Sequence, residues 1–306
     1  MIVRRNHNWF RMLFVWDGSV LQAILPQLGL MLALGLLAVW THGRLLGERV
    51  PLNTAPFTLA GVALTIFLAF RNTASYERYC EARHLWGQVA ISSRALVSQA
   101  LNYASPDPAV FDRQAFVQRL IAFVYALKHQ LRGTDPAADL RRLLGPDQAN
   151  AVLRAEYRPV AILNETRRVL GEQQRQGKLR GTGLWMLDGQ LNELGAMLGG
   201  CERIASTPIP YPYGVLLHRT VYIYCALLPF CLVSSIGGLT PVVSVFVSYT
   251  LIALEAIAGE IAEPFGTAPN SLALDAMTRS IERSLLELCG KEIPPAPRPD
   301  PRYRLS

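Results

Sequence analysis

Four stretches of the chain are almost free of polar residues, and they predict helices that cross a membrane. The first, 20–40, has 21 residues without a charge, which at about 1.5 Å per residue spans roughly 31 Å, the thickness of a bilayer core. A second apolar stretch covers 57–70. Two more, 215–236 and 242–261, are separated by a Gly-Gly-Leu-Thr-Pro turn and predict a helical hairpin.

A cleaved signal peptide is the competing interpretation of the stretch 20–40, because arginines precede it. The apolar run is too long for a signal peptide, and no small-residue cleavage site follows it. We therefore expect this stretch to be retained as a transmembrane helix.

The helical pattern of the second stretch continues beyond its apolar part. After Phe70 charged residues follow at positions 71, 77, 78, 81 and 83, and no proline occurs before Pro106. This pattern predicts a membrane helix that runs on into water. The apolar part of 14 residues is short for a helix that faces lipid along its length, so something other than lipid must surround its lower half.

The segment between the second and third stretches predicts a helical domain. Its apolar residues recur three and four positions apart, with Asp and Pro at the starts and Gly at the stops, in the runs 111–131, 136–144, 148–175 and 182–203. No strand pattern of period two is found. The tail is rich in Pro and Arg and cannot bury a core, which predicts a loosely held strap or a disordered segment.

The fold class predicted from these elements is an all-α integral membrane protein, with four transmembrane helices per subunit and a large helical cytosolic domain. The expected divisions are a cytoplasmic N-terminal segment (1–19), two transmembrane helices (20–70), the cytosolic domain (71–213), two further transmembrane helices (214–262), a cytosolic helical segment (263–292) and the tail (293–306).

The distribution of positive charge predicts the orientation in the membrane. Positive residues precede the first span, whereas the connector 42–56 is nearly balanced and the connector 237–241 carries no charge. Cytoplasmic segments carry the excess of Lys and Arg, so both termini are expected in the cytoplasm. The residues concerned are Arg4, Arg5 and Arg11 before the span, and Arg44, Glu48 and Arg49 in the connector.

Composition supports a protein that is partly in the membrane, and it excludes several function classes. The chain is 51% hydrophobic and 17% charged, too apolar for an average cytosolic protein. The net charge is +7, but the positive residues are interspersed with acids. The orientation of the chain in the membrane explains this excess, so no nucleic-acid partner is expected. The five cysteines have no metal-binding spacing, and no catalytic or nucleotide-binding motif occurs. We expect no metal, no cofactor and no enzyme activity.

One stripe of the second stretch suggests a pore. Val62, Ile66 and Phe70 recur every four residues and lie along one side of the helix. If several copies surround an axis, each position becomes an apolar ring that can gate a pore by excluding water. The alternative is that the stripe packs on a neighbouring helix, and the periodicity leaves both interpretations open because the stretch is apolar all round.

Two motifs resemble the signature of the bestrophin family, most closely its compact bacterial members. One is 70–83 and the other is 261–266, and the similarity extends from the N-terminus to about residue 292. The signature positions are Arg71, Asn72, Ser75, Tyr76, Arg78, Glu81, Arg83, Pro264, Phe265 and Gly266.

The resemblance implies a homopentameric ion channel of the bacterial inner membrane, with one central pore lined by the second helix. Val62, Ile66 and Phe70 would then form its neck. The family also narrows at its cytosolic exit, at an apolar residue in a Gly-basic-aliphatic-Arg pattern that 177–180 matches, which makes Leu179 the aperture candidate. An ordinary loop leucine is the alternative.

Two departures from the eukaryotic members bear on calcium and on ion selectivity. Those members are calcium-activated chloride channels with acidic residues after the Pro-Phe-Gly, whereas 267–271 offers no carboxylate for a hard cation. Ile66 also replaces an aromatic residue whose positively polarised edge can favour anions. We therefore expect monovalent cations such as sodium or potassium to permeate, with chloride as the alternative.

Several charged residues lie close to or inside the spans. Glu255 falls about 21 Å into the fourth span by helical rise, a depth at which an acid must face protein or water. A partner such as His218 or Arg219 is one explanation, and a functional role is the other. The charges that follow Phe70 predict a paired interfacial collar of Arg71, Arg78 and Arg83 with Glu77 and Glu81.

A hypothesis of another class is a membrane-tethered interaction scaffold, in which the spans only anchor the cytosolic domain. Four spans exceed what anchoring needs. A secondary transporter is a third possibility, but the two helix pairs do not resemble one another, which argues against it.

Overall fold

The computed structural model describes residues 1–3, 10, 15–16, 18–45, 48–49, 54–105, 107 and 110–305. Arg4, Arg5 and Arg11, on which the predicted orientation depends, lie outside these residues. The chain divides into two compact units. We call Arg5–Tyr79 with Pro208–Glu263 the apolar unit, and Met1–Arg4, Cys80–Thr207 and Pro264–Ser306 the polar unit.

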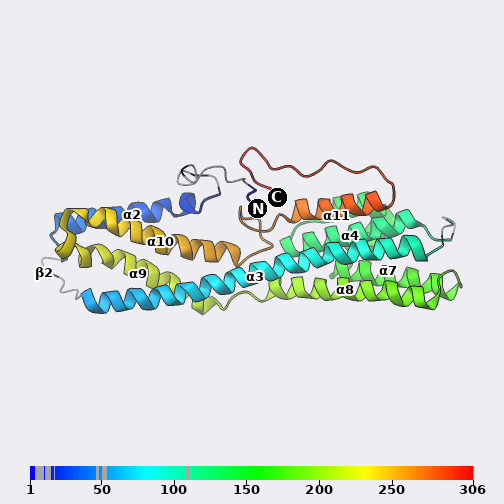
Figure 1. Cartoon of the computed structure of the whole chain (residues 1–306), viewed down its shortest axis with the longest axis horizontal. Helices are drawn as coiled ribbons and strands as arrows, with labels where there is room; N and C mark the ends of the chain where they lie inside the picture. Colours follow the sequence, from blue (N-terminus) through cyan, green and yellow to red (C-terminus); the bar gives the residue numbers. More distant parts are fainter. Residues whose placement is uncertain are drawn as a thin grey trace. The chain divides into compact units, whose positions relative to one another are not determined.

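Long helices build the described part of the apolar unit (Figure 1). They are α2 (Leu21–Trp40), the first part of α3 (Thr54–Tyr103), α9 (Tyr211–Ile236) and α10 (Thr240–Ile261), and the short 3-10 helix η1 (Gly237–Leu239) joins the last two. α2 packs along α10 and α9. Gly35 permits this approach, because a Cβ there would lie 2.9 Å from the Cα of Pro241.

The core of the apolar unit is shared by all four helices. α3 contributes Leu64 and Leu68 to a buried cluster that also contains Met31, Val221 and Ile252. Between helices in a bilayer such packing is stabilised by van der Waals contact and not by the hydrophobic effect, because lipid tails are as apolar as leucine. The predicted helical hairpin is therefore formed by α9 and α10, and it packs against the first two predicted spans.

Among the residues that the structure describes, three segments are long and apolar enough to cross a membrane: Leu21–Trp40, Ala55–Tyr103 and Tyr211–Ile261. The third contains both α9 and α10. A short antiparallel pair of strands, β1 (Arg44–Leu45) and β2 (Glu48–Arg49), follows α2. Strands of two residues carry no readable periodicity, so the sequence did not predict them.

α3 is one continuous helix of 50 residues, Thr54–Tyr103. Its only proline, Pro56, lies in the first turn, where a missing N–H is tolerated. The prediction that the helix continues past Phe70 is confirmed.

The polar unit is built around α4 (Arg113–Arg132), which is buried on every side from residue 119 to residue 128. Asp112 caps its start by accepting a hydrogen bond from the N–H of Ala115 at 2.9 Å, and Gly133 ends it in the left-handed conformation. α4 packs against α5, α7, α8 and α11, and α7 packs on α8 (Figure 1). The surrounding helices are α5 (Ala137–Leu144), α6 (Pro146–Leu153), α7 (Arg158–Arg175), α8 (Gly181–Ser206) and α11 (Leu274–Leu288).

The predicted run 148–175 is not one helix. α6 ends at Leu153 and α7 begins at Arg158. The break follows from Pro159, which lacks an N–H and whose ring would clash with the carbonyl four residues earlier, so that it fits only in the first turn of a new helix. The apolar period continued across the proline and concealed the break.

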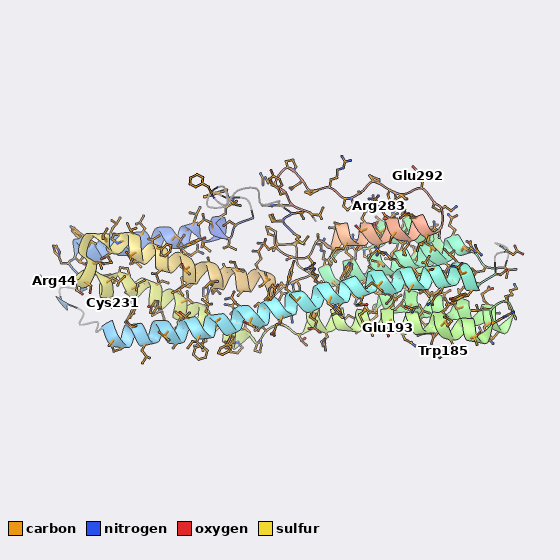
Figure 2. All side chains as sticks on the ribbon, viewed as in Figure 1. Arg44, Trp185, Glu193, Cys231, Arg283 and Glu292 are labelled. Carbon is orange, nitrogen blue, oxygen red and sulfur yellow. The ribbon has the colours of Figure 1, made fainter. Side chains whose placement is uncertain are left out.

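The tail is a strap whose end is held by the start of the chain. The N–H of Val3 donates to the carbonyl of Tyr303 at 2.9 Å, and the N–H of Leu305 donates to the carbonyl of Met1 at 2.8 Å. Figure 2 shows the tail that begins near Glu292, and its residues 291–300 lie outside any helix or strand. Of the two predicted alternatives for the tail, the structure has the strap.

Candidate ion pathway

The stripe of the second span faces away from the core of its own unit. Val62, Ile66 and Phe70 are 53%, 50% and 63% exposed, whereas Leu64 and Leu68 on the same helix are 3% and 1% exposed. The two leucines pack into the apolar core. A single chain therefore leaves the whole stripe uncovered.

An ion pair ties the end of this stripe to α10. Arg71, the residue after Phe70, donates from Nη1 to Oε1 of Glu255 at 2.8 Å, and both side chains are largely buried. The Nδ1 of His218 lies 3.5 Å from the same oxygen. The acid within the fourth predicted span thus has the partner that its depth requires. The sequence suggested His218 or Arg219 as this partner. Of these two, His218 is the one that lies beside Glu255, whereas the side chain of Arg219 is exposed.

The Arg71–Glu255 pair borders a cavity of about 610 Å³ within the apolar unit. Two cations, Arg71 and Arg219, and two acids, Glu255 and Glu263, line it together with His218. The charges of both signs are balanced, so the cavity offers no obvious site for one kind of ion.

Two residues of the first signature motif, Asn72 and Arg78, donate to backbone carbonyls of α3 and of the end of α10, and a third, Ser75, is buried. The side-chain amide of Asn72 donates to the carbonyl of Leu68 at 2.9 Å. Ser75 is fully buried, and among the described residues its hydroxyl has no hydrogen-bond partner. Arg78 donates from Nε to the carbonyl of Ala262 at 2.7 Å. A cation that binds a terminal carbonyl caps the helix and complements its dipole.

The other signature residues lie in different surroundings. Glu81 forms an ion pair with Arg203 of α8, while Tyr76 and Arg83 are exposed. Pro264 and Phe265 are buried and Gly266 is partly exposed, in a turn where the N–H of Leu272 donates to the carbonyl of Pro264 at 2.9 Å. The ion pairs of Arg71 and Glu81 thus reach to other helices, and not along α3 as the predicted collar required.

Leu179, the aperture candidate, lies in the turn between α7 and α8. Gly177 adopts a positive φ of 72° there, and the N–H of Leu179 donates to the carbonyl of Gln173 at 3.2 Å. The leucine side chain is buried in its own chain, against Gly183. To line an aperture it would have to leave this position, and the assignment stays a prediction.

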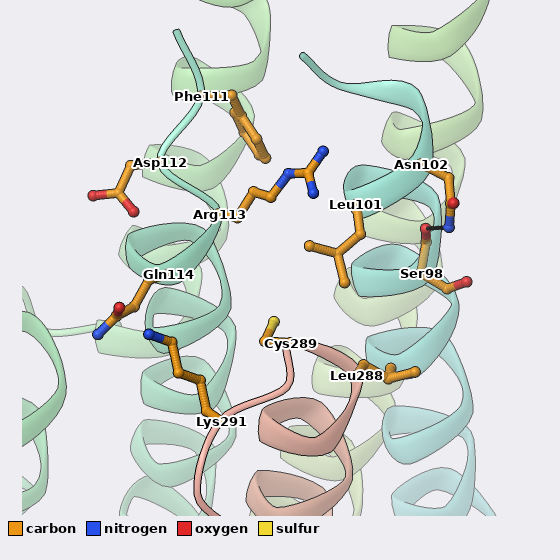
Figure 3. A pocket seen from close by; sticks show the side chains of 10 residues that line it. All are labelled: Ser98, Leu101, Asn102, Phe111, Asp112, Arg113, Gln114, Leu288, Cys289 and Lys291. Carbon is orange, nitrogen blue, oxygen red and sulfur yellow. Dashed lines mark hydrogen bonds between the residues drawn. The ribbon is translucent and has the colours of Figure 1, made fainter. Parts of the chain in front are cut away.

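A cavity of about 540 Å³ lies in the polar unit, between the ends of α3 and α11 and the start of α4. Figure 3 shows the Arg113 guanidinium reaching from α4 toward Leu101 on α3, with the Cys289 thiol below it. Burial raises the pKa of this thiol, although Lys291 and Arg113 counteract the shift. The thiol is therefore protonated at neutral pH, and none of the predicted site residues lines this cavity.

The pairing of Arg71 with Glu255 was not predicted. The two residues are 184 positions apart, and no spacing rule connects them. The sequence nevertheless contains a signal for this pair. An acid inside a span requires a cationic partner, and Arg71 is the first charged residue after the second apolar stretch.

The profile described as "Bacterial/Fungal Bestrophin protein" matches residues 1–287. A protein of Ralstonia nicotianae named voltage-dependent anion channel-forming protein is 47% identical over 291 residues, which are 95% of each chain. A protein of Escherichia coli K12 with the same kind of name is 40% identical over 307 residues, covering all of both chains.

Solved structures match as well. The crystal structure of a bacterial bestrophin homologue from Klebsiella pneumoniae superposes with a TM-score of 0.84 and 43% identity, covering 88% of this chain and 99% of that chain. These relatives are named as channel-forming proteins. Because the chain belongs to the same family, it is not an enzyme. On the match of its sequence and its predominantly helical fold, the chain belongs to the bacterial and fungal branch of the bestrophin family.

Proposed function

We propose that the chain forms a homopentameric channel for monovalent ions, with Val62, Ile66 and Phe70 as the rings of a hydrophobic neck. The observation that carries the proposal is the exposure of the apolar part of α3, where Leu59 and Phe67 are as exposed as the stripe, and the family resemblance selects the stripe. Apolar side chains that their own chain leaves uncovered need lipid or another copy. The apolar part of α3 is too short for lipid along its whole length.

Family membership supports the same arrangement. Relatives named as channel-forming proteins cover nearly the whole chain. In such an assembly the neck would exclude water when it is narrow, and ions would pass when it widens slightly. The Arg71–Glu255 pair, next to the neck, would hold the end of each pore-lining segment against α10.

The proposal places four helices per subunit in a bacterial inner membrane, namely α2, the first part of α3, α9 and α10, with both termini in the cytoplasm. α9 and α10 are separate helices of 26 and 22 residues, and each is long enough to span the bilayer core at about 1.5 Å per residue.

Cations are the proposed permeant ions, because Ile66 gives the middle ring no aromatic edge that could favour an anion. Anion conduction is the second candidate, and the names of the relatives favour it. The two candidates differ in one measurable quantity, the reversal potential under a salt gradient.

The test is a recording from the purified protein in planar bilayers under a gradient of KCl or NaCl. The expected reversal potential lies near the equilibrium potential of the cation, and Ile66→Phe should move it toward that of chloride. A wild-type reversal near the chloride potential would replace the cation proposal by the anion proposal. Absence of current from well-folded pentamers would favour the scaffold.

A further inference from the structure

The central helix of the polar unit buries two cations, and only one of them is neutralised. Arg119 and Lys128 on α4 are 8% and 7% exposed. The Nζ of Lys128 lies 3.0 Å from Asp275 and 3.8 Å from Asp139. Arg119 has no hydrogen bond or salt bridge to any described residue. A buried charge without a partner is costly and calls for an explanation.

The acid that attracts Arg119 most strongly is already engaged. Glu165 on α7 accepts from Arg168 through both oxygens, at 2.9 Å to Nε and 2.7 Å to Nη2. Burial lowers the pKa of Arg119 below its ordinary value, and the attraction of Glu165 and Asp112 does not offset the burial and the repulsion by Arg168. The guanidinium is thus left without a counter-charge in contact.

Arg119 lines a cavity of about 450 Å³ between α4, α5, α6 and α7. This volume lies in the range of roughly 300–1,000 Å³ that small-molecule sites occupy. Glu165, Arg168 and Gln148 supply the other polar groups. The remaining lining is aliphatic and consists of Leu144, Ala151, Val152, Ala161 and Ile162.

We propose that this cavity binds a small monocarboxylate, whose carboxylate pairs with Arg119 and whose short apolar body lies against Leu144, Val152 and Ala161. A guanidinium matches a carboxylate with two parallel hydrogen bonds. The aliphatic wall disfavours a strongly hydrated anion such as sulfate, and the negative charge of Glu165 disfavours a dianion. The proposal does not depend on the ion that the channel conducts.

The experiment uses the full-length protein in detergent and measures its unfolding temperature in sodium butyrate and sodium benzoate. Sodium chloride and sodium sulfate at matched ionic strength are the ionic controls, and 1-butanol is the uncharged control. A ligand that binds only the folded state raises the unfolding temperature in a saturable way. We expect a saturable rise with the two carboxylates and none with the controls.

Two variants test the site from different sides. Arg119→Leu should weaken butyrate binding at least about tenfold, the effect of losing about 1.4 kcal/mol. Without ligand it should unfold at the wild-type temperature or higher, because it removes an unpaired buried charge. A purely structural Arg119 would instead make the variant less stable. Ala161→Phe fills the cavity, keeps Arg119, and should also lose the rise with butyrate.

Arg175→Leu is the matched control, because Arg175 is an exposed arginine of α7 that does not line the cavity; it should keep the rise. The proposal is overturned if neither carboxylate stabilises the wild type, or if the rise survives in both Arg119→Leu and Ala161→Phe. An equal rise with chloride or sulfate would overturn the monocarboxylate assignment. If Arg119→Leu does not fold, Ala161→Phe decides.

Discussion

At the scale of single residues, the charges near the proposed neck are held by specific partners. Glu255 lies on the predominantly apolar helix α10, and Arg71 and His218 both approach its Oε1. Two opposite charges in an apolar environment stabilise one another only when both are present, because removal of one leaves the other desolvated and unpaired. Because this pair is largely buried, removal of either partner should lower the free energy of unfolding more than removal of an exposed charge.

Glu255→Gln tests this pair. The variant leaves the Arg71 guanidinium largely buried without a counter-charge, and we expect the free energy of unfolding to fall by about 3 kcal/mol. Denaturant unfolding of the detergent-purified protein measures the change. Arg219→Gln is the control, since Arg219 is exposed on the same cavity, and it should change stability by less than about 0.5 kcal/mol. Equal losses in both variants would show that the pair has no special role.

A second charge cluster stabilises the polar unit. The buried carboxylate of Glu282 on α11 accepts from Tyr125 Oη at 2.6 Å, from Arg142 at 2.7 Å and from Arg279 at 2.9 Å. Burial alone would raise the pKa of Glu282, but these hydrogen bonds outweigh it and hold the pKa below its ordinary value. The folded state therefore binds this proton less readily than the unfolded state.

The cluster predicts a loss of stability in acid. A carboxyl group with a lowered folded-state pKa contributes stability above its unfolded pKa, about 4.3 for Glu, and loses it as the pH falls through the folded pKa. Urea unfolding measured from neutral pH to about pH 3 should show this fall. Glu282→Gln should flatten the pH profile, whereas Glu287→Gln, exposed on the same helix, should keep it. An unchanged profile in Glu282→Gln would contradict the assignment.

At the scale of elements, α3 is the helix that both units share. Two of its glycines have opposite surroundings. A Cβ at Gly87 would meet nothing within 4 Å, whereas a Cβ at Gly61 would lie 2.5 Å from the Oη of Tyr224. The Tyr224 ring is also stacked on Phe57, with 4.4 Å between the centroids, so it cannot easily move away.

These surroundings predict opposite effects of adding a methyl group. Gly87→Ala should stabilise the protein by about 0.5–1 kcal/mol, because alanine loses less backbone entropy in a helix. Gly61→Ala should destabilise it by about 1–3 kcal/mol through overpacking against Tyr224. Thermal unfolding of the two variants beside the wild type measures both. A destabilised Gly87→Ala would mean that a neighbouring subunit approaches α3 at this position.

Elements were predictable where one local rule decided them. The length of α3 followed from the absence of proline after its first turn, and the hairpin of α9 and α10 followed from the glycines between them. The break before Pro159 was not predicted, because the apolar period continues across the proline. The pairing of Arg71 with Glu255 and the isolation of Arg119 could not be predicted, because both depend on which helices meet in three dimensions.

At the scale of the whole molecule, the exposed stripe and the buried leucines of α3 assign opposite faces of one helix to different partners. Leu64 and Leu68 belong to the core of the chain, and Val62, Ile66 and Phe70 are left for lipid or for further copies. Lipid would tolerate changes of size in the stripe. A ring of neighbouring subunits would instead convert each change into a change of pore width, multiplied by the number of subunits.

Substitutions of Ile66 distinguish these cases. Ile66→Ala widens the proposed middle ring and lowers the cost of wetting the neck, so the current in planar bilayers should rise several-fold. Ile66→Asp adds a carboxylate from every subunit and should leave the pore leaky at rest. Native mass spectrometry should give five subunits for the wild type and for both variants, which separates an effect on conduction from a loss of assembly. Pentamers with unchanged current in both variants would show that Ile66 does not face the ion pathway, and any other subunit number in the wild type would contradict the pentamer itself.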